Sequence, residues 1–181
     1  AFLVDNGFVT PDEIGFGELL FLREAPGEGY YPSTRESASF YQVNFYPKAA
    51  SRTILKLNPQ DSLIGVRILP DGEVFSAHVV RLGTLSESSS QYKLKSYSEF
   101  SNDIGKAVLV SLDEGNIYLP DLPAGAVSKV SISEVELAYF LEAKDSLILQ
   151  PVYLLRGEAS VSGYPGTVSA FLYLPAISLS N

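Results

Sequence analysis

The 181-residue sequence contains no cysteine, no methionine, no tryptophan and only one histidine. Without cysteine the chain has no disulfide framework, no thiolate metal site and no cysteine nucleophile. The one histidine, His78, lies within an apolar stretch, and the Gly-x-Ser-x-Gly motif of serine hydrolases is absent from the chain. A Ser-His-Asp triad needs a nucleophilic serine and an acidic partner at the histidine, and a zinc site usually needs more than one His or Cys ligand. We therefore expect no catalytic residue, no metal ligand and no cofactor.

The sequence also lacks an excess of positive charge and a long apolar run. It has 13 Lys and Arg against 21 Asp and Glu, which gives a net charge of -8. Nucleic acid binding needs clustered Lys and Arg, so it is excluded. No apolar run reaches the length of about 18 to 20 residues that spans a membrane, so we expect no membrane insertion by this chain itself. A membrane anchor would have to lie upstream of Ala1.

What the sequence does contain is a series of strand patterns. With 46% hydrophobic and 19% charged residues it can bury a core. Residues 130–177 organise the chain, because they are rich in β-branched and aromatic residues between glycines and prolines. A buried strand is predicted over residues 147–155, with a turn beginning at residues 156–158. Pro151 lies inside that strand and has no N–H, so we expect a bulge or break there.

Two helices and a linker complete the prediction. Residues 1–7 read as the end of a helix that stops at Gly7, and residues 96–105 as a helix opened by a capping box of Ser96 and Glu99. The serine-rich residues 86–91 are predicted to be a linker between halves at 1–85 and 92–181. We therefore predict an α+β protein, an internal duplication in which each half is an antiparallel sheet packed with one helix.

Four segments carry a resemblance to a known group. They are residues 92–100, 130–140, 149–153 (Leu-Gln-Pro-Val-Tyr) and 173–177 (Tyr-Leu-Pro-Ala-Ile). Their order resembles that of the YycI-like extracytoplasmic regulatory proteins, and of uncharacterised secreted proteins of candidate-phylum bacteria. The match covers chiefly residues 92–177. The resemblance implies a bacterial, membrane-tethered domain of the cell envelope that interacts with a partner and performs no catalysis.

Paired carboxylates keep an alternative open. Glu134 and Glu136 stand two apart on a predicted strand, and Asp113 and Glu114 share a predicted turn. Two carboxylates can hydrolyse glycosidic bonds, so a cell-wall-acting hydrolase is the first rival. A purely structural envelope protein is the second. Acidic pairs of this kind also occur on solvent-facing strand edges, and that interpretation is favoured here.

Aromatic residues give the candidate contact surface. Tyr30 and Tyr31 are predicted to lie in a loop, where burial is less obligatory, and tyrosine provides rigid contact area. Gln150 and Tyr153 flank the expected bulge at Pro151, and bulges often lie beside functional surfaces. We therefore expect a non-enzymatic, extracytoplasmic domain that binds a protein or peptide, with a membrane protein among the candidates, by surface contact or strand addition.

Overall fold

A computed structural model describes residues 2–25, 27, 29–57, 62–82, 86, 91–112, 117, 119–142 and 148–178. The described chain separates into two compact units, Ala1–Thr53 with Ser62–Leu85, and Ile54–Asp61 with Ser86–Asn181. Of the expected linker, only Ser86 and Gln91 are among the described residues. The predicted domain boundaries therefore stay a prediction, and each unit is described by itself.

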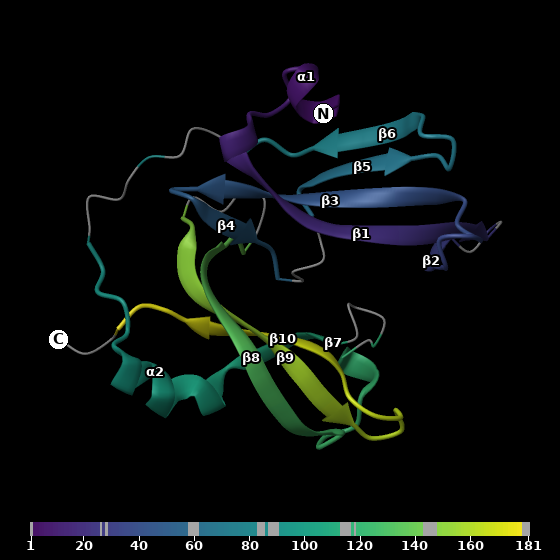
Figure 1. Cartoon of the computed structure of the whole chain (residues 1–181). Helices are drawn as coiled ribbons and strands as arrows, with labels where there is room; N and C mark the ends of the chain where they lie inside the picture. The colour runs from purple at the N-terminus through teal and green to yellow at the C-terminus, as the bar shows by residue number, and fades with distance from the viewer. Residues whose placement is uncertain are drawn as a thin grey trace. The chain divides into compact units, whose positions relative to one another are not determined.

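The first unit is built on an antiparallel sheet in the order β2-β1-β3-β5-β6 (Figure 1). Its elements are α1 (Phe2–Asp5), η1 (Pro11–Glu13), β1 (Ile14–Ala25), β2 (Gly29–Pro32), β3 (Phe40–Ala49), β5 (Ile64–Ile68) and β6 (Val74–Val79). Pro70, Asp71 and Gly72 between two apolar runs predict a hairpin turn, and the turn forms: Gly72 has φ +94° and lies between β5 and β6. The sheet leaves two outer strands, β2 and β6.

The second unit has an antiparallel sheet in the order β8-β9-β10-β7. Its elements are α2 (Tyr97–Asp103), η2 (Ile104–Lys106), β7 (Val108–Leu112), η4 (Leu119–Asp121), β8 (Val127–Phe140), β9 (Gln150–Val161) and β10 (Val168–Pro175). The strand β4 (Arg52–Leu55) crosses from one unit to the other. Its first two residues pair with β3, whereas Ile54 and Leu55 pair in parallel with the end of β8.

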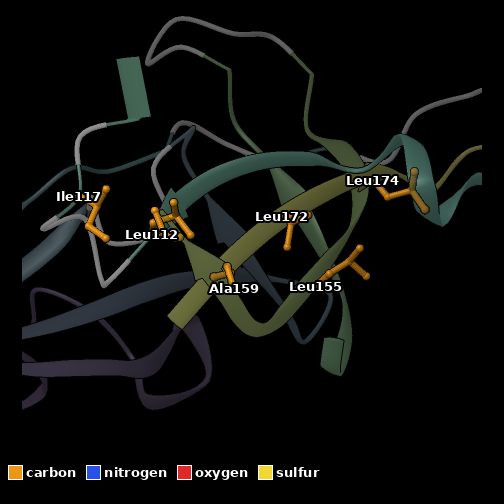
Figure 2. Packing of buried hydrophobic residues seen from close by; sticks show 8 residues of the cluster. Leu112, Ile117, Leu155, Ala159, Leu172 and Leu174 are labelled. Atoms are coloured by element: carbon orange, nitrogen blue, oxygen red, sulfur yellow. The ribbon is translucent and has the colours of Figure 1, made fainter. Parts of the chain in front are cut away.

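The largest part of the core lies in the second unit. Figure 2 shows the cluster of buried side chains from β7, β9 and β10. Its members are Leu112, Ile117, Leu155, Ala159, Val161, Ala170, Leu172 and Leu174. Phe100 of α2 packs against this cluster. The predicted capping box of α2 is confirmed, since the Ser96 N–H donates to Glu99 Oε2 (2.8 Å) and the Glu99 N–H donates to Ser96 Oγ (3.3 Å).

The predicted α+β class with one helix on each sheet is wrong. The described chain is mostly strand, and α2 is its only α-helix longer than one turn. In the first unit α1 ends after four residues, because Gly7 takes the left-handed conformation (φ +68°) and Pro11 opens a separate 3-10 turn. A single turn is too short to be stable without packing and too short to cover a sheet face.

The two halves also differ in topology, so the internal duplication is not a repeat of one fold. Both units contain an antiparallel three-stranded meander, β3-β5-β6 and β8-β9-β10. The strand that precedes each meander joins it at a different end. β1 pairs with β3, the first strand of its meander, whereas β7 pairs with β10, the last strand of the other. Similar local patterns predicted similar strands, but a pattern does not decide which sheet edge a strand joins.

Two predictions for β9 are wrong. The strand does not turn at residues 156–158 but continues to Val161. No register shift occurs at Pro151, which faces Tyr139 and whose carbonyl accepts the Ala176 N–H at 3.0 Å. Pro151 is the second residue of the strand, one of the few places where a missing N–H is tolerated. The bulges lie instead between Val127 and Lys129, and between Ile132 and Glu134.

Candidate functional site

The outer edge of β6 is the first feature of the first unit that could bind a partner. Among the described residues β6 pairs with β5 alone. The Val80 N–H donates to the Leu63 carbonyl at 2.8 Å, so the main-chain groups of Val80 point toward β5. Because hydrogen bonding alternates along an antiparallel strand, the main-chain groups of Ala77 and Val79 point away from β5. They form a short row of exposed donors and acceptors.

This edge carries little of the protection that natural sheets usually have. The six residues of β6, Val-Phe-Ser-Ala-His-Val, include neither a proline nor a Lys, Arg, Asp or Glu. The opposite edge strand of the same sheet, β2, is four residues long and ends in Pro32. Charges, prolines and short length are common devices that block unwanted strand pairing. Within the described part of the first unit, β6 is therefore the edge more open to another strand.

An apolar groove runs beside this edge. A cleft of about 680 Å³ lies between the N-terminal segment and the end of β6. A second hollow of about 460 Å³ is lined by Phe8, Ala77, Val79 and Arg81. We refer to the cleft and this hollow together as the groove. Phe8 lines both hollows and keeps 43% of its surface exposed. The side chains of Ala77 and Val79 share one sheet face, so the groove lies against the same two residues whose main chain is unused.

The polar end of the groove is formed by η1 and Arg81. The Thr10 N–H donates to Glu13 Oε2 at 2.8 Å. Hydrogen bonds from the main chain and side chain of Thr10 hold the pKa of Glu13 below its usual value, and the charge of Arg81 adds to this effect. The ionised carboxylate therefore ties down the start of η1, which is one wall of the groove.

This pKa shift leads to a pH-dependent stability. Because the pKa of Glu13 is lowered on folding, the stabilisation is present above the carboxyl's unfolded pKa of 4.5 and is lost as the pH falls through the folded value. We expect Glu13→Gln to destabilise the first unit at pH 6, and the difference from the unaltered protein to shrink as the pH drops below 4.5. Urea unfolding at several pH values measures it. Asp12→Asn, in the same turn, is the control, and an equal pH dependence for both variants would contradict the assignment.

A row of polar side chains crosses one face of the same sheet. Arg67 Nε donates to Gln42 Oε1 (3.0 Å), Gln42 Nε2 to Asn44 Oδ1 (3.0 Å), and Asn44 Nδ2 to Glu18 Oε1 (3.1 Å). Asn44 is only 1% exposed. The row has a cation at one end and a carboxylate at the other, so each amide can be oriented in only one way. Its members come from three neighbouring strands, β1, β3 and β5.

The two tyrosines predicted as a contact surface lie in β2 and not in a loop. Tyr30 is 46% exposed and Tyr31 is 42% exposed. They point to opposite faces of the sheet, as neighbours in a strand do. Tyr30 packs edge-to-face on Phe40, with ring centroids 5.0 Å apart, and Arg67 lies over its ring at 4.8 Å. The structure thus brings Tyr30 to the end of the polar row and leaves Tyr31 away from it.

The two residues predicted in the second half have separate surroundings. Gln150 is exposed at the start of β9. Tyr153 is half-buried: its ring packs edge-to-face on Phe100 with centroids 5.2 Å apart, and its hydroxyl donates to the Lys95 carbonyl at 3.3 Å. These contacts give Tyr153 a part in holding α2 on the sheet. Both residues belong to the second unit, whereas Tyr30 and Tyr31 belong to the first.

The remaining candidate residues can also be placed. His78 lies over Gly65, with Nε2 3.3 Å from the Ser62 carbonyl oxygen. Glu134 and Glu136 both contact Arg156 Nη1, at 3.2 and 3.0 Å. Asp113 and Glu114 lie outside the described residues. Within the described ranges, no cluster of His, Asp and Glu has the arrangement of a metal site.

Sequence reasoning did not single out Phe8, Ala77 or Val79. The apolar, uncharged stretch from Val74 to Val80 was a visible signal, but its position at a sheet edge is decided by strand order. None of the helices in the described chain is long and apolar enough to cross a membrane. Comparisons with protein-family models, curated proteins and solved structures give no match to this chain. The YycI-like resemblance stays a prediction from the sequence.

Proposed function

We propose that this protein is a non-enzymatic binding module that takes an extended segment of a partner protein or peptide as an added strand at the outer edge of β6. The observation that supports this proposal is the coincidence of two features at Ala77 and Val79. Their main-chain donors and acceptors are unused by the sheet. Their side chains line an apolar groove with Phe8.

The chemistry of the edge defines the partner. A main-chain ladder is satisfied by another extended main chain, which explains why exposed edges recruit strands. Partner residues opposite Ala77 and Val79 would point to the same face as these two side chains and enter the groove. We therefore expect apolar residues at positions i and i+2 of the partner. Arg81 continues the same parity at the groove end, which favours an acidic residue at i+4.

The test uses peptides selected on the protein itself. A phage-displayed library of linear peptides is selected against the folded chain, and the Kd of the recovered peptides is measured by calorimetry. Ala77→Pro removes the outward N–H of Ala77, which the sheet does not use. We expect binding at least about tenfold weaker, because a lost hydrogen bond is worth about 1 kcal/mol and the proline ring obstructs the edge. Ala77→Gly keeps the N–H and is the matched control, with Kd expected to change less than about threefold.

Amide hydrogen exchange identifies the contact. In the free protein the Ala77 and Val79 amides should exchange quickly and the His78 amide slowly, since only His78 points toward β5. A bound peptide should slow exchange at Ala77 and Val79. The proposal is contradicted if the recovered peptides bind the Ala77→Pro variant as tightly as the unaltered chain. It is also contradicted if the library gives no binder.

A further inference from the structure

We propose a second binding site in the first unit: the guanidinium of Arg67, with its aromatic neighbours, binds the carboxylate of a ligand that carries an aromatic or other apolar body. The site lies on the sheet face of the polar row, and it uses neither the groove nor the main-chain groups of Ala77 and Val79. It rests on observations separate from those behind the strand-addition proposal.

The first step is the fixed position of Arg67. Its side chain is half-buried on β5, and its Cζ lies 4.8 Å from the ring centroid of Tyr30 and 5.3 Å from that of Phe40. The two rings are nearly perpendicular, at 89°, so they form a corner in which the guanidinium packs. Stacking on aromatic rings is a geometry that arginine adopts readily and lysine does not.

The second step is the support behind Arg67. Gln42 accepts the Nε–H, and its own amide is held by the buried Asn44, which is held by Glu18. The orientation of every group in this row depends on the next one, so Gln42 cannot turn away without leaving a neighbour unsatisfied. A cation held by an ordered hydrogen-bond row has lost its side-chain entropy before any ligand arrives, which favours binding.

The third step is what Arg67 leaves unused. Within the described ranges, the Nε hydrogen bond and the two ring contacts are the only polar and aromatic interactions of the Arg67 side chain, so both Nη atoms have donors available. By contrast, two other partly buried cations of the described chain are paired with carboxylates: Arg156 with Glu134 and Glu136, and Lys95 with Asp103. An arginine fork with open donors matches a carboxylate in a bidentate geometry.

The apolar part of the ligand is indicated by Phe75. This bulge residue of β6 is 58% exposed, and its ring centroid lies 6.4 Å from that of Phe40. Tyr30 is the other exposed ring of the cluster. The exposed rings of Tyr30 and Phe75, both next to Phe40, give a ligand's apolar body a surface to cover while its carboxylate binds Arg67.

The experiment follows backbone amide and arginine Nε–H signals of the protein by NMR during titration with 3-phenylpropionate. We expect saturable shifts at Arg67, Tyr30 and Phe75. The neutral analogue 3-phenylpropanamide, which has the same body without the charge, should bind at least about tenfold more weakly. Acetate, the charge without the body, should also bind more weakly. Equal shifts with the acid and the amide would overturn the proposal, and so would equal affinity for acetate.

The variants separate this site from general electrostatics. Arg67→Gln should reduce the affinity for 3-phenylpropionate at least about tenfold, and Arg67→Lys nearly as much, since lysine lacks the planar fork. Arg23→Gln removes the same charge from the opposite face of the sheet and should leave the affinity unchanged. If Arg67→Gln unfolds the unit, the exposed Phe75→Ser keeps the test decisive, with weaker binding expected. Equal losses in the Arg23 and Arg67 variants, or no effect of Phe75→Ser, would refute the site.

Discussion

Replacing Gly157 with alanine is expected to destabilise the second unit by about 3 kcal/mol, the upper part of the usual range for overpacking. Gly157 lies in the middle of β9, opposite Ile132 of β8. A Cβ on Gly157 would overlap the Ser131 carbonyl oxygen and stand 2.9 Å from Ile132 Cα. These are main-chain atoms of a paired strand, so the clash can be relieved only by moving the sheet.

Urea unfolding followed by circular dichroism measures this effect. Gly105→Ala is the matched control, because a Cβ on Gly105 meets no atom within 4 Å. The control should be neutral or slightly stabilising, since alanine reduces the entropy of the unfolded chain at a compatible position. A Gly157→Ala protein as stable as the control would mean that β8 and β9 do not approach each other as the bulge near Ile132 requires.

Replacing Leu155 with alanine is expected to cost roughly 2 to 5 kcal/mol, the range for a buried leucine reduced to alanine. Leu155 is 0% exposed and lies within the core cluster of the second unit (Figure 2). Its neighbours come from paired strands, which cannot collapse freely into the space left behind. The loss therefore includes both the transfer of apolar surface and the cavity.

The same substitution at an exposed leucine provides the control. Leu57 is 65% exposed, and Leu57→Ala should change the free energy of unfolding by less than about 0.5 kcal/mol. The two variants are compared by urea unfolding under identical conditions. Similar stabilities would show that the β7-β9-β10 cluster is not the core of this unit.

Short-range features of the fold were predictable from the sequence. The capping box of Ser96 and Glu99 and the Gly72 turn depend on residues three or fewer positions apart. The alternation over residues 38–46 predicts a strand that ends at Pro47, and β3 forms there but continues to Ala49. In each case the physical cause is local: a side chain satisfies a nearby main-chain group, a glycine adopts a positive φ, or a period of two builds one face.

The candidate sites depended on contacts that the sequence does not encode locally. The sequence predicts Gly157 to lie in a turn, yet it lies in the middle of β9. There the β8 main chain passes too close to leave room for a Cβ. Gln42 and Arg67 are 25 residues apart, and only the pairing of β3 with β5 brings them together.

By itself, the sequence determined the strand patterns, the turn at Gly72, the helix α2 and the absence of thiol chemistry. The tertiary structure decided which strands lie at sheet edges, and therefore that Ala77 and Val79 present an unused ladder. It also decided that Arg67 meets Tyr30 and Phe40. The reason is that strand order and cross-strand register arise from long-range pairing, for which a period-two pattern specifies a face but not a neighbour.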